Sequence, residues 1–140
     1  MPVSGKSPVI PSMRYRDAET AIDWLCRVLG FSRHLVVAGE GGTIAHAQLT
    51  LGDGMIMLGS ERDDDHGQVM AVPGPRGANT QSAYLVVDDP QAVHDRALAA
   101  GADIVTPLHH PEYGGAAFAC RDPEGHVWNI GSYDPWQPSA

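Results

Sequence analysis

The sequence AAFACRDPEGHVWNI, residues 116–130, reads as a strand, a tight turn and a second strand. Its turn, Asp122–Gly125, is made of residues that favour turns, and apolar residues flank it on both sides. Residues 44–59 repeat this arrangement, with Gly52–Gly54 between two apolar runs. The two halves of the chain therefore carry related hairpins.

The same spacing relates the segments that precede the hairpins. Short alternating runs end at Asp17 and at Asp88, 71 positions apart, and each aspartate is suited to cap a following helix. Amphipathic patterns then lead to Gly30 and Gly101, again 71 apart, where helices are expected to end. Each half is predicted to contain a strand, a helix, one further strand and a hairpin, which is a βαβββ unit.

These landmarks define the expected organisation of the chain. Residues 1–140 are predicted to form one α+β domain, with a first unit at 8–60 and a second at 81–133. Residues 61–80 are rich in Asp, Gly and Pro and lack periodicity, so they are interpreted as a linker of loop character.

Charge and cysteine content exclude several classes of function. Acidic residues outnumber basic ones 17 to 9, and no basic run occurs, so a nucleic-acid partner is not expected. No stretch is long and apolar enough to suggest a membrane partner, and residues 1–7 do not resemble a secretory signal. Cys26 and Cys120 lie in no metal or redox spacing and are interpreted as buried thiols, which favours a cytoplasmic location.

Several segments together resemble one known family. They are Arg14–Asp17, Ala21–Leu25, Val28–Phe31, His46–Leu49, Gly52–Gly54 and Asp122–Trp128. The resemblance is to the vicinal oxygen chelate superfamily, the glyoxalase/bleomycin-resistance/dioxygenase family, and it spans about residues 9–133. It implies that the two βαβββ units form paired half-barrels around a cleft. It leaves the reaction open, because the superfamily hosts lyases, epimerases, dioxygenases and drug-binding proteins.

The resemblance also implies where a metal site would lie. Metal-dependent members place one ligand on the first strand and one on the last strand of each unit. The matching positions are Ile10 and Leu58 in the first unit, and Gln81 (or Ser82, one residue further) and Asn129 in the second. Ile and Leu offer no lone pair, and amide oxygens are weak ligands for Zn²⁺ or Fe²⁺. We therefore expect no metal and no other cofactor.

Strand alternation predicts which side chains line the cleft. The expected ligand-binding residues are Ser12, Arg14, Gln48, Thr50, Ile56, Leu58, Gln81, Arg121 and Asn129. The two arginines favour an anionic or carbonyl-bearing ligand, although ion pairs with Asp17 or Asp122 at strand ends are an equal alternative. His46 is the candidate catalytic residue for proton transfer, and a histidine that only hydrogen-bonds on a polar sheet face is its alternative. Trp24, Trp128 and Tyr84 are predicted to be packing residues.

Two functions follow from these expectations. The first is a metal-independent protein that binds a small organic, anionic ligand, as a drug-sequestering resistance protein does. The second is a metal-dependent lyase, isomerase or dioxygenase, for which His46, His109 or His110, and Glu112 would have to supply the ligands. Whether the protein is an enzyme stays open. Family members often dimerise, so a homodimer is expected.

Overall fold

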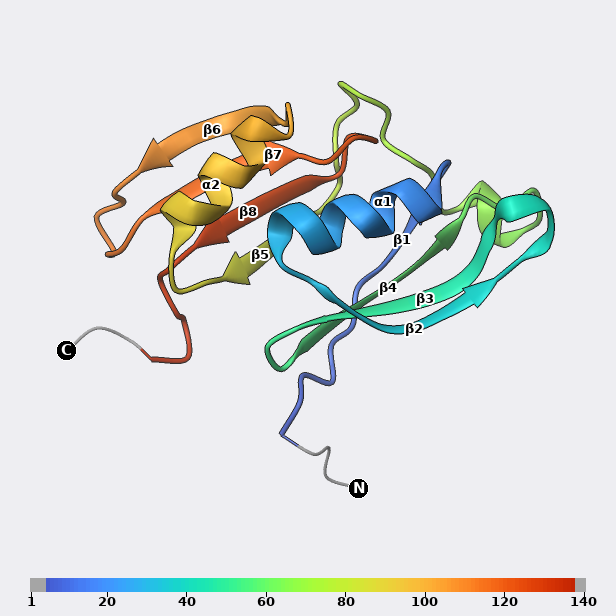
Figure 1. Ribbon diagram of the computed structural model, residues 1–140, viewed down its shortest axis with the longest axis horizontal. Coiled ribbons are helices and arrows are strands. Elements are labelled where there is room, and N and C mark those ends of the chain that lie inside the picture. Colours follow the sequence, from blue (N-terminus) through green and yellow to red (C-terminus); the bar gives the residue numbers. More distant parts are fainter. Residues whose placement is uncertain (1–4, 138–140) are drawn as a thin grey trace. The chain divides into compact units, whose positions relative to one another are not determined.

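The computed structural model describes residues 5–137, His66 by its backbone alone. The chain divides into two compact units, Met1–Val72 and Pro73–Ala140. In each unit, one long helical segment packs against a sheet of four strands (Figure 1). The predicted α+β class and the two βαβββ units are therefore confirmed.

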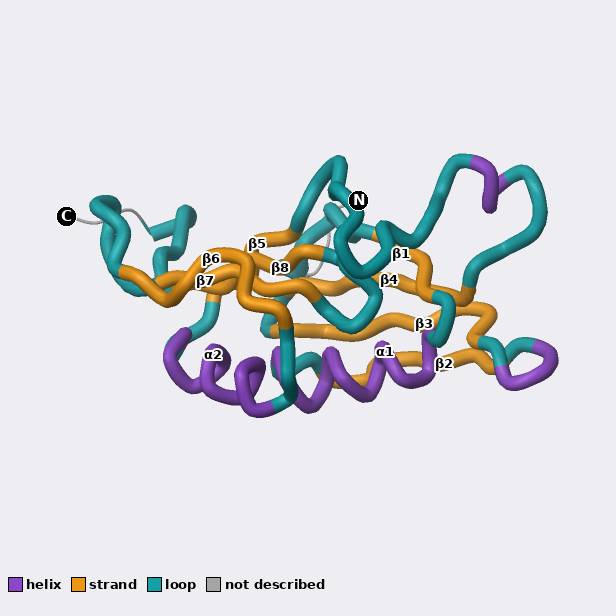
Figure 2. Tube along the Cα trace, turned by 90° about the horizontal axis from the view of Figure 1, so that it is seen from above, coloured by secondary structure: helices purple, strands orange, loops and turns teal. Residues whose placement is uncertain are grey.

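Unit 1 has its strands in the order β1-β4-β3-β2, with β1 parallel to β4 and the other pairs antiparallel. Helix α1 continues directly into a π-helical turn, η1, and this helical segment lies along the strands (Figure 2). The elements are β1 Ser12–Tyr15, α1 Ala18–Trp24, η1 Leu25–Leu29, β2 Ser32–Ala38, the 3₁₀ turn η2 Glu40–Gly42, β3 Ile44–Leu51, β4 Gly54–Ser60 and the 3₁₀ turn η3 His66–Gln68.

Unit 2 repeats this topology with the strand order β5-β8-β7-β6. Its elements are β5 Ala83–Val86, α2 Pro90–Ala99, β6 Asp103–His109, β7 Ala117–Arg121 and β8 Val127–Gly131. No helix in residues 5–137 is long and apolar enough to cross a membrane.

Local signals explain where the helices begin and end. The Asp17 carboxylate accepts the backbone N–H of Thr20 at 3.2 Å, and the Asp89 carboxylate accepts that of Ala92 at 3.2 Å. The second cap is thus Asp89, and the prediction of Asp88 is wrong by one residue. Gly30 ends the first helical segment with a φ of 91°, a left-handed conformation that glycine adopts without steric cost.

The sequence offset between equivalent residues of the two units changes along the chain. The helix caps Asp17 and Asp89 are 72 apart, whereas Gly30 and Gly101 are 71 apart. The first helical segment therefore holds one extra residue, and the π-helical turn accommodates it.

The hairpins shift the spacing a second time. Gln48 of β3 pairs with Met57 of β4, and Ala119 of β7 pairs with Asn129 of β8. Gln48 and Ala119 are 71 apart, but Met57 and Asn129 are 72 apart. The turn of the second hairpin therefore has one residue more than the turn of the first.

Each unit has its core between the helix and one face of the sheet. In unit 1 this core includes Tyr15, Leu49 and Leu58, all essentially inaccessible to solvent. In unit 2 it includes Phe118 and Trp128, and the Trp128 indole N–H donates to the buried Asp122 carboxylate at 3.1 Å. The packing roles predicted for Trp24 and Trp128 are confirmed, since both are buried.

Part of the predicted linker is fixed to unit 2. The Asn79 side chain donates to the Gly125 carbonyl and accepts from the Val127 backbone N–H, both at 3.0 Å. The Arg121 guanidinium donates to the Gly77 carbonyl at 2.9 Å. Residues 77–79 therefore lie against the β7–β8 hairpin although they form no helix or strand.

Candidate functional site

The face of the unit 1 sheet that does not pack on α1 carries half of the predicted site residues. Strand pairing places Ser12 beside Met57, Met57 beside Gln48, and His46 beside Val37, and paired residues share a face. We call this the helix-free face of unit 1. It carries Ser12, Arg14, Leu35, Val37, His46, Gln48, Thr50, Met55 and Met57.

Two predicted ligand-binding residues lie on the opposite face. Ile56 pairs with Leu49 and Leu58 with Ala47, and all four are buried toward the helix, Ile56 with 4% and Leu58 with 1% of its surface exposed. The prediction that Ile56 and Leu58 share a face with Gln48 is therefore wrong. It assumed a constant spacing of 71 between the units, and the longer second turn makes Met57, not Leu58, the counterpart of Asn129.

His46 and Gln48 form a polar pair on the helix-free face. The Gln48 side-chain amide nitrogen lies 3.0 Å from His46 Nε2. When the amide donates, Nε2 is the unprotonated nitrogen of a neutral ring and Nδ1 carries the proton; this tautomer is assigned from the hydrogen bond. Such a ring presents Nδ1–H as a donor to a ligand, while the nitrogen that could accept a proton is already hydrogen-bonded.

Arg14 places a positive charge on the same face. Partial burial lowers the pKa of its guanidinium, nearby Arg62 lowers it further, and Asp64 opposes both. Gly59, its partner on β4, makes room for it, because a Cβ at that position would lie 2.5 Å from Arg14 Nη1. A half-buried guanidinium can bind a carboxylate or phosphate more strongly than an exposed one, because water competes less.

Arg121, the second predicted arginine, is engaged within unit 2. It donates to the carbonyls of Gly77 and Gly125, at 2.9 and 3.2 Å, and its Nε lies 3.5 Å from an Asp103 carboxylate oxygen. Arg121 therefore forms the ion pair at a strand end that was the alternative to ligand binding, but its partner is Asp103 instead of Asp17 or Asp122.

The predicted site residues of unit 2 include a hydrogen-bonded pair. Asn129 donates to the Ser82 hydroxyl at 2.8 Å and to the Ala83 carbonyl at 3.1 Å. Ser82, the neighbour of Gln81, is thus the residue that meets Asn129, and Gln81 is exposed before β5 begins. Of the two predicted positions, Gln81 and Ser82, the structure therefore places Ser82 beside Asn129.

The positions that hold a metal in metal-dependent relatives do not fit a metal here. By strand pairing they are Ile10 and Met57 in unit 1, and Ser82 and Asn129 in unit 2. None is an imidazole, thiolate or carboxylate, the ligands that Zn²⁺ and Fe²⁺ prefer. Within residues 5–137, the described His, Cys, Asp and Glu side chains form no group of three that could hold a cation.

The histidines of the alternative metal site point to backbone carbonyls. His109 Nδ1 lies 2.9 Å from the Pro107 carbonyl, and His110 Nδ1 lies 3.2 Å from the Gly115 carbonyl. Each ring is therefore oriented by a backbone carbonyl close to it in sequence, and Glu112 is exposed.

A group of tyrosines was missed in the sequence. Tyr84 pairs with Asn129 and is 37% exposed, so its predicted burial in the core is wrong. Its hydroxyl donates to the Tyr133 carbonyl at 2.7 Å, and the ring of Tyr133 meets that of Tyr113 edge to face at 4.9 Å. Burial and the neighbouring tyrosines raise the pKa of Tyr84. The available signal was strand alternation, because assigning Leu85 to the core puts its neighbour Tyr84 on the opposite face, as β5 shows.

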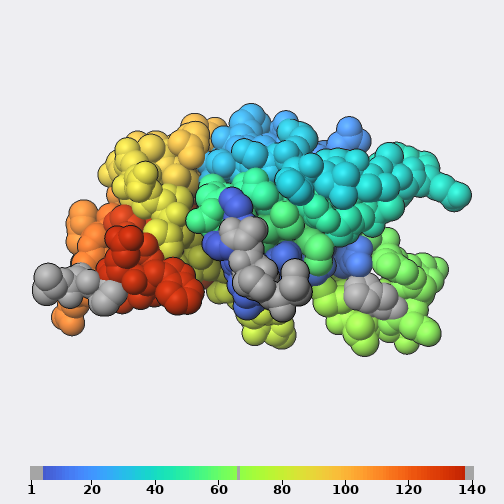
Figure 3. Space-filling view, turned by 90° about the horizontal axis from the view of Figure 1, so that it is seen from below, coloured from blue at the N-terminus to red at the C-terminus, as the bar shows by residue number. Residues whose placement is uncertain are grey.

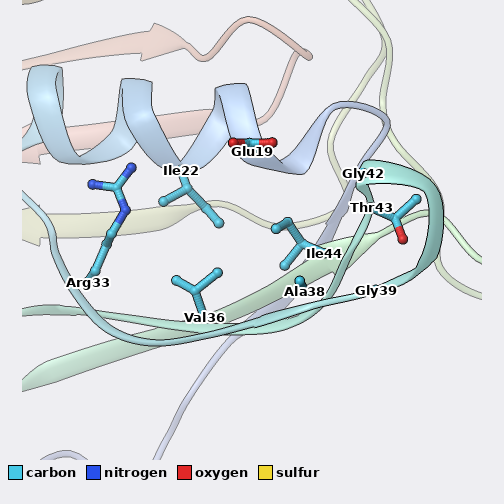
Figure 4. Close-up of a pocket in the computed structure, with 9 residues that line it drawn as sticks. All are labelled: Glu19, Ile22, Arg33, Val36, Ala38, Gly39, Gly42, Thr43 and Ile44. Carbon is cyan, nitrogen blue, oxygen red and sulfur yellow. The ribbon is translucent and has the colours of Figure 1, made fainter.

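A groove of about 470 Å³ lies on the other side of the unit 1 sheet, between α1 and β2 (Figure 4). Ile22, Val36 and Ile44 line its apolar part, and Glu19 and Arg33 supply its charges. None of the predicted site residues lines this groove.

Comparisons with known proteins agree with this fold. Residues 10–130 match the family model of the Glyoxalase/Bleomycin resistance protein/Dioxygenase superfamily, and the chain belongs to this superfamily. The crystal structure of TioX from Micromonospora sp. ML1 is 33% identical, with a TM-score of 0.69 over 89% of this chain and 97% of that one. A glyoxylase/bleomycin resistance protein/dioxygenase domain from Frankia sp. EAN1pec shares the fold at 20% identity, with a TM-score of 0.67 over 93% of this chain and 98% of that one. The protein Rv0887c of Mycobacterium tuberculosis is 29% identical over 131 residues, which is 94% of this chain and 77% of that protein.

Proposed function

We propose that this chain is a metal-independent binding protein for a small organic anion, and that the helix-free face of unit 1 supplies the binding groups. The observation that carries the proposal is the half-buried Arg14 guanidinium, seated against Gly59. Around it the face offers neutral hydrogen-bonding groups, from Ser12 and Gln48, and the flexible apolar side chain of Met57. One cation, a few directional polar groups and apolar contacts are the usual composition of a small-molecule site.

The competing function is a metal-dependent lyase, isomerase or dioxygenase of the same superfamily. The donor set at the positions that such enzymes use does not suit a transition metal, as described above. A metal-independent enzyme is compatible with the same face, with His46 as the group that exchanges a proton. Its hydrogen bond with Gln48 favours a role in holding the ligand.

The proposal is tested by calorimetric titration of chelator-treated protein with benzoate, salicylate and the neutral analogue benzamide. We expect the carboxylates to bind and benzamide to bind at least tenfold more weakly, because a charge-assisted hydrogen bond contributes about 1.5–3 kcal/mol. Arg14→Gln should remove this preference. Arg16→Gln is the matched control, since exposed Arg16 lies 3.7 Å from Glu61 in a surface ion pair.

Either of two results would overturn the proposal. One is carboxylate binding that is the same in the Arg14→Gln variant and in the unchanged protein. The other is binding or turnover that appears only when Zn²⁺, Fe²⁺ or Mn²⁺ is restored, which would favour the metal-dependent enzyme.

A homodimer and a cytoplasmic location belong to the same proposal. Superfamily membership supports the dimer, and the free thiols of Cys26 and Cys120 support a reducing compartment. Cys120 is buried as predicted, whereas Cys26 is half-buried, so the prediction that both thiols are buried is wrong for Cys26. Sedimentation velocity at several concentrations measures the oligomeric state.

A further inference from the structure

Strand β2 is an edge of the unit 1 sheet and is exposed along its whole length. It has a hydrogen-bonded neighbour, β3, on one side only. Leu35, Val36 and Val37 have 43%, 40% and 43% of their surfaces exposed, although all three are large and apolar. The surface of β2 and of the turn that follows it lies open on the outside of unit 1 (cyan in Figure 3). An exposed apolar edge strand is a template for the addition of another strand.

The equivalent edge strand of unit 2 is protected against such pairing. β6 contains Pro107, which has no N–H to donate, and begins with the charged Asp103. In β2 the charged residues stand at the start, and the run Leu35–Ala38 contains neither proline nor charge. Both strands begin with charged residues and both pair irregularly with their inner neighbour, so the two edges of this duplicated fold differ in one protective feature, Pro107 of β6.

Both sides of β2 are uncovered, which indicates what kind of partner fits. Leu35 and Val37 point to the helix-free face, whereas Val36 points into the groove beside α1 (Figure 4). A small molecule in the groove would cover Val36 and leave Leu35 and Val37 exposed. A strand that extends the sheet would contact all three, because neighbouring strands meet on both faces.

The charges along this edge are arranged so that they can pair with the same charges of a second copy. Arg33 lies near the start of β2, Glu40 lies just after its end, and Glu19 stands on α1 across the groove. Within residues 5–137, the part that the structure describes, none of these three side chains forms a hydrogen bond or an ion pair. A second copy that runs antiparallel along β2 would bring the positive end of each strand to the negative end of the other.

We propose that two copies of this chain associate through their β2 strands, antiparallel, about a two-fold axis that passes Val36. Val36 then faces Val36 of the second copy, and Leu35 faces the second copy's Val37, so each residue meets one on its own side of the sheet. Arg33 comes next to the second copy's Glu40. The result is one sheet of eight strands with its apolar edge covered. This interface uses unit 1 alone and does not depend on what the protein binds.

The first test is a disulfide across the axis. Cα atoms of directly opposed residues in an antiparallel pair are about 4.5–5.5 Å apart, which suits a disulfide. The Val36→Cys variant, in a Cys26→Ser background, should form a covalent dimer on mild oxidation, and Cys120 is fully buried and does not interfere. Val105→Cys on β6 is the matched control, since Val105 is 47% exposed on the protected edge. Equal cross-linking of the two variants, or none in either, would overturn the proposal.

The second test reverses the charges at the two ends of the edge. Arg33→Glu and Glu40→Arg should each weaken self-association about tenfold, because like charges then meet twice in the dimer. An equimolar mixture of the two variants should recover association as a heterodimer, since both contacts are again between opposite charges. Native mass spectrometry separates the heterodimer from the homodimers. The proposal fails if single variants associate as the unchanged protein does, if the mixture does not recover, or if the unchanged protein is monomeric at high micromolar concentration.

Discussion

The closing turn of unit 2 is predicted to be the most sensitive point of that unit, because one buried carboxylate organises it. Asp122 Oδ1 accepts the backbone N–H groups of Glu124 and His126, at 3.0 and 3.1 Å. Its Oδ2 accepts the indole N–H of Trp128 at 3.1 Å. Asp122 is 5% exposed and Trp128 is 1% exposed, so water cannot replace these bonds.

The replacement Asp122→Asn keeps the size of the side chain and changes its hydrogen bonding. An asparagine whose oxygen still accepts from the turn would direct its NH₂ group at the Trp128 indole N–H, so two donors would face each other. A buried donor left without an acceptor costs about 1–3 kcal/mol. The two turn bonds change from charge-assisted to neutral, and each loses about 0.5–1 kcal/mol. The free energy of unfolding should therefore fall by about 3 kcal/mol.

Urea unfolding followed by far-UV circular dichroism measures this loss. Trp128→Phe removes the indole N–H, so Asp122→Asn should cost at least 1 kcal/mol less in that background. Asp53→Asn is the control, because Asp53 is an exposed partner of Lys6 at 3.0 Å and should change stability by less than about 0.5 kcal/mol. A loss below about 1 kcal/mol for Asp122→Asn, or no coupling to Trp128, would show that the Asp122 carboxylate does not organise this turn.

Three further predictions concern a steric contact and the thiol of Cys120. Gly125→Ala should destabilise the protein by about 2 kcal/mol more than Gly101→Ala does. Both glycines have positive φ, but only a Cβ at position 125 would collide with the Gly74 carbonyl. Urea unfolding of the two variants measures the difference. Burial, with nearby Asp122 and Asp103, raises the pKa of Cys120 to about 12, so a disulfide reagent at pH 8 should label only Cys26 in the folded protein and both thiols in urea. Because the folded state holds the Cys120 proton more tightly than the unfolded chain does, stability should also fall as the pH rises above about 8.5.

The architecture could be predicted from the sequence because its signals are local. The turn at Asp122–Gly125 and the turn at Gly52–Gly54 each lie between apolar runs, and both hairpins formed where expected. The helices begin at aspartate caps and end near Gly30 and Gly101. Each of these features depends on residues within a few positions of one another, so no long-range information was needed.

The face of several site residues could not be predicted, because a shift of one residue reverses it. The spacing between the units is 72 at the helix caps, 71 after the helices and 72 again after the hairpin turns. A single spacing of 71 therefore selected Leu58 in place of Met57, and Gln81 in place of Ser82. The extra residue of the first helix is absorbed by a π-helical turn, and no local pattern marks it.

The two arginines show a second limit of local patterns. Arg14 and Arg121 were given the same role because each lies on a strand with the same alternation. In the structure the linker brings the Gly77 carbonyl to Arg121, whereas Gly59 makes space for Arg14. Both neighbours are distant in sequence, 44 residues away for Gly77. The role of a charged side chain thus depended on contacts that alternation does not report.

The duplicated units nevertheless share one structural feature, a glycine on the last strand beside a large polar side chain of the first strand. Gly59 and Gly131 hold the same place at the end of β4 and β8, and a Cβ at either would lie 2.5 Å from a polar atom, Arg14 Nη1 or the Tyr84 hydroxyl oxygen. Each last strand therefore leaves room for one large polar side chain of the first strand. That side chain is a cation in unit 1 and a phenol in unit 2, so the same framework presents different chemistry in its two halves. Membership of the superfamily fixes the framework alone and does not fix the chemistry of these two side chains.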